Sequence, residues 1–120
     1  MNNEYTNIER YRKTARIRHV EEQNQIRKRY QKAWDTVYQL SGILKEEFGV
    51  TEIFVFGSLR HFDLFHDHSD IDIAVKGINE KEYYHAVARV MTAEFNVDLI
   101  MIESSSDRMK QCIKKEGIRL

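Results

Sequence analysis

A chain of 120 residues suits one domain, and its 42% of hydrophobic residues are enough for a globular core. Its single cysteine, Cys112, excludes an internal disulfide, and no apolar run approaches the roughly 18 residues needed to span a bilayer. The N-terminus has no apolar signal core either, so we expect a cytoplasmic protein with no membrane partner.

The formal net charge is zero, but the charges are unevenly distributed along the chain. Residues 1–32 contain nine bases and four acids, a balance of +5, whereas residues 33–120 contain ten bases and fifteen acids, a balance of −5. This division predicts a basic helical N-terminal extension over residues 1–32 and one domain over residues 33–120. A solvated helix face, an RNA contact and a surface for an acidic partner all fit the basic segment.

The first predicted element is a long helix from residue 4 to about residue 47. Its second half places Ala33, Val37, Leu40 and Leu44 at the i, i+4, i+7, i+11 spacing of a face turned toward a core. The first half is poorer in apolar residues, so we expect it to extend away from the domain.

Three short runs rich in β-forming residues follow, separated by helical or polar segments. The strands are expected at residues 52–56, 70–75 and 97–102. Between the first two strands, Leu59–Ser69 is predicted as a loop or short helix. A helix from Asn79 to about residue 94 follows the second strand. A last helix begins near Ser104–Asp107 and has Gly117 as its C-terminal cap. This alternation predicts an α/β (α+β) domain with a small sheet covered by helices.

Three aspartates interrupt the apolar strands. Asp70 and Asp72 are two residues apart in one strand, so their side chains leave the same face of the sheet. Asp98 lies among apolar neighbours in the third strand, where an unpartnered carboxylate is costly to bury. If the two strands are adjacent, the three carboxylates meet and need a cation, and Mg²⁺ suits them because it prefers oxygen ligands. The alternative is that they are ordinary turn and strand-edge aspartates.

Gly57 and Ser58 directly follow the first strand. A glycine there lets the backbone approach a phosphate closely, and the serine hydroxyl and nearby N–H groups can bind phosphate oxygens. The pair alone is an ordinary turn, but its combination with the aspartate strands is more specific. The polar loop before Asp70 also holds a group of possible transition-metal ligands, whose spacing matches no defined zinc pattern: Asp63, His66, Asp67 and His68.

The sequence resembles the nucleotidyltransferase superfamily that includes DNA polymerase beta, and in particular its minimal prokaryotic domains. The resemblance rests on four stretches: Phe56-Gly57-Ser58, Ser69-Asp70-Ile71-Asp72-Ile73, Val97-Asp98-Leu99-Ile100 and the ending Ile113–Leu120. It covers roughly residues 33–120 and implies a polymerase-beta-like fold with a mixed three-stranded sheet. It also implies Mg²⁺-dependent transfer of a nucleoside monophosphate, with ATP as the default substrate and pyrophosphate leaving.

The resemblance also implies roles for individual residues. Gly57 and Ser58, with Arg60 nearby, would bind the triphosphate. The metal ligands and catalytic residues would be Asp70, Asp72 and Asp98, and Asp98 would also help to deprotonate the attacking hydroxyl. The family usually has ten residues between Gly-Ser and the first aspartate, whereas Leu59–Ser69 is eleven, and Arg60 is offset by one from either usual arginine position.

Many minimal members of this family are encoded beside a small helical HEPN partner, often a ribonuclease toxin, and act as its antitoxin. Some transfer AMP to a tyrosine of that toxin, so the resemblance implies an antitoxin that modifies a protein or RNA acceptor. The departures leave open a degenerate domain that acts by binding a partner, and the basic helix leaves open an RNA-binding module. The small size implies that the acceptor site comes from another chain or from a second copy.

Overall fold

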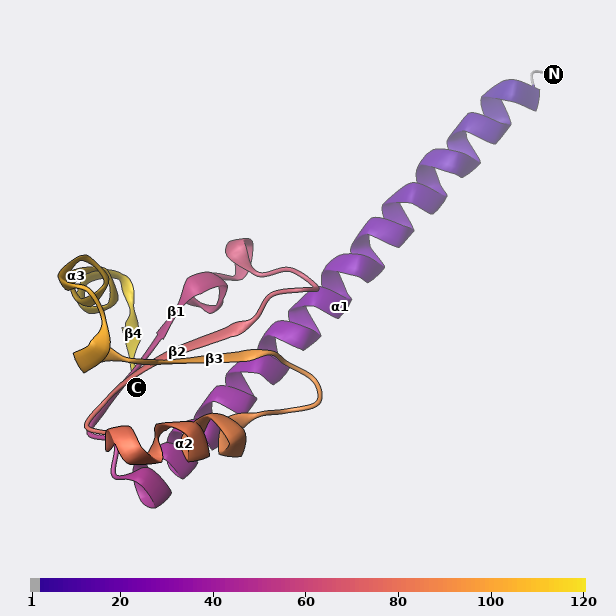
Figure 1. Ribbon diagram of the computed structural model, residues 1–120. Coiled ribbons are helices and arrows are strands. Elements are labelled where there is room, and N and C mark those ends of the chain that lie inside the picture. Colours follow the sequence, from indigo (N-terminus) through magenta and orange to yellow (C-terminus); the bar gives the residue numbers. More distant parts are fainter. Residues whose placement is uncertain (1–2) are drawn as a thin grey trace.

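The computed structural model describes the backbone of residues 3–120 and the side chains of residues 7–120. Helix α1 (Asn3–Phe48) is one continuous helix whose first part projects well beyond the remainder of the molecule (Figure 1). This agrees with the predicted helix from residue 4 to about residue 47. No helix in the described part of the chain is long and apolar enough to cross a membrane.

The two halves of α1 differ in burial as the sequence pattern predicts. Residues 7–22 are all exposed, whereas Ala33, Val37, Leu40 and Leu44 lie in the core with 0–4% of their surface exposed. The helix ends where Gly49 adopts a positive φ of 66°, which a glycine accepts without strain.

A four-stranded mixed sheet forms the centre of the domain, in the order β3-β2-β1-β4. Its strands are β1 (Glu52–Phe56), β2 (Ile71–Lys76), β3 (Val97–Met101) and β4 (Ile118–Arg119). β1 pairs antiparallel with β2 and with β4, and β2 pairs parallel with β3. The first three strands match the prediction to within one residue at each end. The prediction of a three-stranded sheet missed β4, because a strand of two exposed residues has no apolar alternation.

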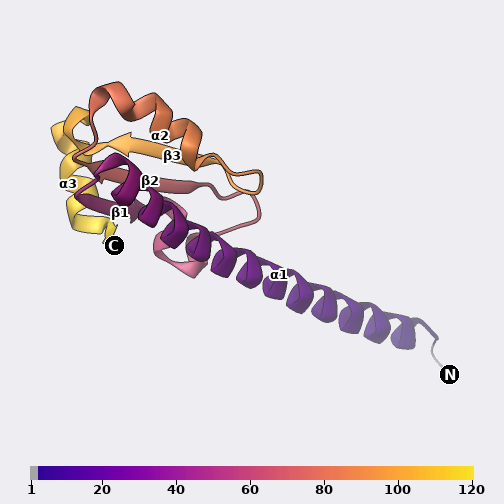
Figure 2. The same ribbon diagram turned by 90° about the horizontal axis from the view of Figure 1, so that it is seen from below.

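One face of the sheet is fully buried and the other is partly open. Side chains of Ile53, Val55, Ile71 and Ile73 alternate toward the buried face, and all are 0% exposed. Helices α1 and α2 (Tyr83–Val90) pack together on the domain (Figure 2), and both belong to this core. The other face carries Phe54, Phe56, Asp72 and Asp98 by the same alternation, and α3 (Asp107–Glu116) covers part of it beside β1.

The helices after β2 and β3 differ in detail from the prediction. Asn79 caps a short 3₁₀ turn (Glu80–Glu82) through its side chain, but α2 ends at Val90 rather than near residue 94. Ser106 caps α3 by accepting a hydrogen bond from the Met109 N–H, within the predicted start.

Gly117 is the C-terminal cap of α3, as predicted, and its φ of −70° is an ordinary one. A glycine is needed there because a Cβ atom would lie 2.5 Å from the Ile113 carbonyl oxygen.

Candidate functional site

The three aspartates of the sequence pattern come together at one end of the open sheet face. Asp72 in β2 is the register partner of Asp98 in the parallel neighbour β3, so their side chains lie on the same face. Asp70 directly precedes β2 and shares that face by alternation. Asp70 and Asp72 are partly buried, and Asp98 is exposed. The expected adjacency of the two aspartate strands is thus confirmed.

The electrostatics of this end are dominated by repulsion among carboxylates. Partial burial, a hydrogen bond to Asp98 and the negative charges of Asp98 and Asp70 together raise the pKa of Asp72 to about 6. Ionisation of Asp72 beside these two carboxylates is therefore unfavourable. A set of oxygen donors that repel one another is chemically suited to a hard cation.

The donor set is open rather than closed. In residues 7–120, no three His, Cys, Asp or Glu side chains form a ready-made metal-binding group. The three aspartates are therefore not a complete set of metal ligands, and a metal ion there would need further oxygen ligands from a bound molecule. The histidine-rich loop does not form a metal-binding group either. In that loop His66 is held locally, because its N–H donates to Ser69 Oγ at 2.8 Å and its Nδ1 accepts from the His68 N–H at 3.2 Å.

Gly57 lies directly against Asp72. It begins the 3₁₀ turn Gly57–Arg60 at the end of β1, where Phe56 is the register partner of Asp72. Its φ is +73°, and a Cβ atom at this position would overlap the Asp72 carboxylate. The sequence suggested that this glycine lets a phosphate approach, and the structure adds that it lets Asp72 approach.

Arg60 is held by protein groups. Its Nε donates to the Gly57 carbonyl oxygen at 2.9 Å, and its guanidinium contacts Glu116 Oε2 of α3 at 3.2 Å. The side chain therefore braces the Gly57 turn from the side of α3. Sequence reasoning did not identify Glu116, because nothing in the local sequence shows that the end of α3 returns to the first turn.

The turn after β1 is also supported from α1. The Tyr30 hydroxyl donates to the Leu59 carbonyl oxygen at 3.0 Å, and its ring packs edge-on against Phe62 and Phe65. Contacts between α1 and the core begin at Ile26, within the segment predicted as an extension. The predicted boundary between residues 32 and 33 marks the change in charge, whereas the packing of α1 against the core begins slightly earlier, at Ile26.

The fold of this chain has counterparts among known proteins. The family model "Polymerase beta, Nucleotidyltransferase" matches residues 38–120, whereas no curated protein matches the chain. A solved toxin–antitoxin structure with AMP-PNP is 24% identical, with a TM-score of 0.57 over 71% of this chain and 69% of that chain. The solved MntA–HepT toxin–antitoxin structure is 22% identical, with a TM-score of 0.52 over 74% of this chain and 69% of that chain.

A third solved structure is that of a tri-AMPylated Shewanella oneidensis HEPN toxin in complex with an MNT antitoxin. It is 22% identical to this protein, with a TM-score of 0.53 over 75% of this chain and 70% of that chain. These likenesses show a shared fold. Because the family model also matches well over half of its length, the chain belongs to the polymerase beta nucleotidyltransferase family.

Proposed function

We propose that this protein transfers AMP from ATP to an acceptor hydroxyl, with Mg²⁺ as the metal. The observation that carries the proposal is the position of Asp72, which lies between Asp98 on one side and the Gly57 turn on the other. A carboxylate cluster beside a phosphate-binding turn is what nucleotidyl transfer needs, because catalysis of this kind consists largely of positioning and charge neutralisation.

The roles follow from the placement of each group. Asp70, Asp72 and Asp98 would hold the metal, and the Ser58 hydroxyl and the N–H groups of the turn would bind the triphosphate. Bound Mg²⁺ would offset the negative charge of the carboxylates and the phosphates. The acceptor oxygen would attack the α-phosphorus, the bond to the bridging oxygen would break, and pyrophosphate would leave. The exposed Asp98 carboxylate would take the hydroxyl proton.

The proposed partner is a helical HEPN-type protein, with this chain as the antitoxin of the pair. The similar solved structures support it, since one holds an AMPylated HEPN toxin beside its MNT antitoxin. The exposed first part of α1 offers a surface for such a partner, because residues 7–22 are solvent-accessible along their whole length.

One observation favours a second candidate, a domain that acts on its partner by binding alone. Arg60, which follows Gly57 by three residues in the sequence, is engaged by Gly57 and Glu116 rather than left free for a triphosphate. An RNA-binding module that uses the basic helix would instead show an affinity that falls steeply with salt.

The test is pyrophosphate release from Mg·ATP with a HEPN-type protein as acceptor, measured for wild type, Asp70→Asn and Asp72→Asn. We expect each substitution to reduce turnover by at least about a hundredfold, since charged groups at the reacting centre contribute on that order. Asp35→Asn is the matched control, because Asp35 is exposed on α1. Full turnover in both active-site variants would refute the proposal, and tight complex formation without turnover would favour the binding-only candidate.

A further inference from the structure

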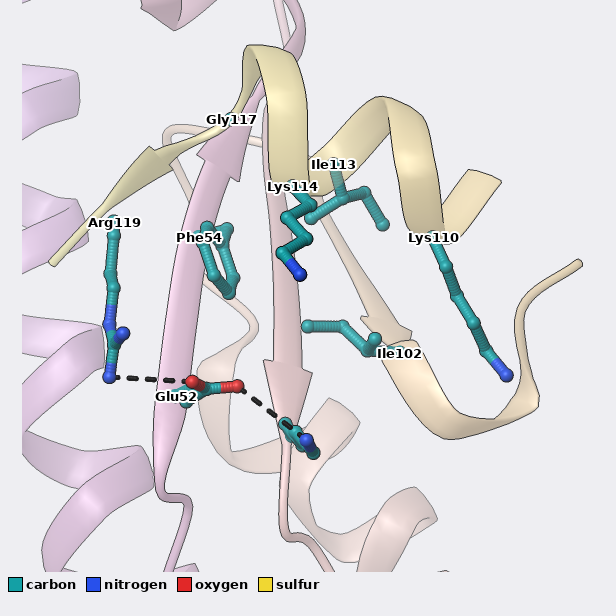
Figure 3. A pocket seen from close by; sticks show the side chains of 9 residues that line it. Glu52, Phe54, Ile102, Lys110, Ile113, Lys114, Gly117 and Arg119 are labelled. Carbon is teal, nitrogen blue, oxygen red and sulfur yellow. Dashed lines mark ion pairs between the residues drawn. The ribbon is translucent and has the colours of Figure 1, made fainter. Parts of the chain in front are cut away.

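A second pocket lies on the open sheet face, between α3 and the end of the sheet far from the aspartates (Figure 3). Its volume is about 500 Å³, within the range of small-molecule sites. Along β1 and β2, Glu52 pairs with Lys76 at this end and Phe56 pairs with Asp72 at the other. Four residues of strand separate the two ends, which is roughly 13 Å.

The charges around the pocket are strongly unbalanced. It is lined by four basic residues and one acid: Lys76, Lys110, Lys114, Arg119 and Glu52. Glu52 is already engaged, since its carboxylate forms ion pairs with Lys76 at 3.9 Å and with Arg119 at 3.4 Å. Lys110 and Lys114 form no ion pair with any described residue, and they are one helical turn apart on α3. Two ammonium groups are therefore available to an anion.

The remaining lining of the pocket is apolar. Phe54, Ile102 and Ile113 contribute side chains from β1, the turn after β3 and α3. In Figure 3 the Lys114 side chain reaches down from α3 into the space beside the Phe54 ring. A ligand there would meet an aromatic surface and a cationic rim at the same time, so a purely apolar or a cationic molecule would fit poorly.

We propose that this pocket binds an organic phosphate, with its phosphoryl group on Lys110 and Lys114 and its ring against Phe54. A phosphate monoester carries close to two negative charges at neutral pH, which matches two unpaired ammonium groups. The aromatic surface supplies stacking for a flat ring, which inorganic phosphate lacks. A free nucleotide and a nucleotide at the end of an RNA share this chemistry.

This site is separate from the proposed triphosphate site. Helix α3 lies between the two, because Lys110 and Lys114 line the pocket, Cys112 and Glu116 line the space beside the Gly57 turn, and Ile113 borders both. The only carboxylate of the pocket is bound to two basic side chains, so binding there requires no divalent metal. The inference therefore goes beyond the proposed reaction and stands or falls independently of it.

The test is calorimetric titration of AMP into the full chain in EDTA, which removes any metal-dependent binding at the aspartates. We expect wild type to bind AMP, and both adenosine and inorganic phosphate to bind more weakly. Lys110→Gln/Lys114→Gln should weaken AMP binding by at least about tenfold, as expected for two charge-assisted contacts. The matched control is Lys13→Gln/Lys28→Gln, which makes the same change in charge on exposed positions of α1 and should bind AMP as wild type does.

Backbone amide and methyl NMR shifts locate the bound molecule. Shifts at Phe54, Ile102 and Gly117 that disappear in the Lys110→Gln/Lys114→Gln variant support the site. Shifts confined to Gly57 and Ser58, equal loss of binding in the control variant, or no AMP binding by wild type would each overturn it. A 5′-phosphorylated RNA dinucleotide distinguishes the sources, since tighter binding than AMP indicates an RNA end and equal or weaker binding indicates a free nucleotide.

Discussion

The two ends of the open sheet face are built on the same two strands and carry opposite charges. One end gathers three carboxylates beside a glycine turn, and the other gathers four basic side chains around an apolar floor. Helix α3 separates them, with one side of the helix turned toward each.

The comparison shows how the same sheet can keep two charged sites apart. The antiparallel register sends Phe56 and Asp72 to one end and Glu52 and Lys76 to the other, so the separation follows from strand length alone. At the carboxylate end, like charges approach one another, and this repulsion contributes to the raised pKa of Asp72. At the basic end, the single acid is neutralised within the protein, and two lysines are left for an anion.

The largest effect on the carboxylate end is expected from Gly57→Ala. The new Cβ atom would overlap the Asp72 carboxylate at a φ that non-glycine residues rarely adopt, so we expect the free energy of unfolding to fall by about 2 kcal/mol. Urea unfolding measures the loss. The matched control is Gly42→Ala in α1, where the Cβ atom would meet nothing within 4 Å and the change should stabilise the helix by up to about 1 kcal/mol. An equal effect of both substitutions would contradict the close contact between Gly57 and Asp72.

Removal of the Tyr30 hydroxyl tests the support of this end by α1. Tyr30→Phe deletes a partly buried hydrogen bond to the Leu59 carbonyl oxygen, so we expect a loss of about 1 kcal/mol in urea unfolding. Tyr38→Phe on the same helix is the control, because that side chain is 62% exposed and should be neutral. If the two variants were equally stable, the contact between α1 and the turn would contribute nothing.

The pH dependence of stability tests the repulsion among the aspartates. The pKa of Asp72 is raised from its ordinary value of 3.8 to about 6 in the folded protein. The folded state therefore binds this proton more tightly than the unfolded state does. The resulting contribution to stability is fully present below pH 3.8 and is lost as the pH rises through about 6. Asp72→Asn should therefore stabilise the metal-free protein at pH 7 by on the order of 1 kcal/mol, after allowance for solvent screening, and by much less at pH 4.

Thermal unfolding at the two pH values measures this difference, and Asp35→Asn serves as the control with one exposed carboxylate removed. A stabilisation by Asp72→Asn that is the same at pH 4 and pH 7 would argue against carboxylate repulsion as its cause.

The smallest expected effect belongs to the ion pair between the Gly57 turn and α3. Glu116→Gln should lower stability by only about 0.5 kcal/mol, because the Arg60 and Glu116 side chains are 26% and 52% exposed. Arg60→Ala should cost more, since it also removes the hydrogen bond to the Gly57 carbonyl oxygen. The difference between the two variants in urea unfolding isolates the bracing of the turn. Equal losses would show that the contact with Gly57 is without effect.

Local sequence patterns were sufficient to predict the parts of this fold that depend on residues close together in the sequence. The runs of β-forming residues at 52–56 and 70–75 predicted the first two strands, and the spacing of Asp70 and Asp72 placed both carboxylates on the same face. Features that depend on contacts distant in sequence could not be read in this way. The strand β4 forms only because residues 118–119 meet β1, and Glu116 meets Arg60 across 56 residues.

The basic pocket illustrates the same limit. Nothing in the local sequence marks Lys110 and Lys114 as parts of a site, and Lys76 lies far from them in sequence. Only the packing of α3 over β1 brings these charges around Phe54.

The most direct test of the account is calorimetric titration of Mg·ATP into the wild-type protein and the Asp70→Asn/Asp72→Asn variant. The matched control is Asp35→Asn/Glu46→Gln, which removes two carboxylates from exposed positions of α1. We expect Mg²⁺-dependent binding that is kept in the control and lost in the aspartate variant. Wild-type protein that binds no Mg·ATP, or an aspartate variant that binds it as well as wild type does, would contradict the assignment of the carboxylate end as the nucleotide site.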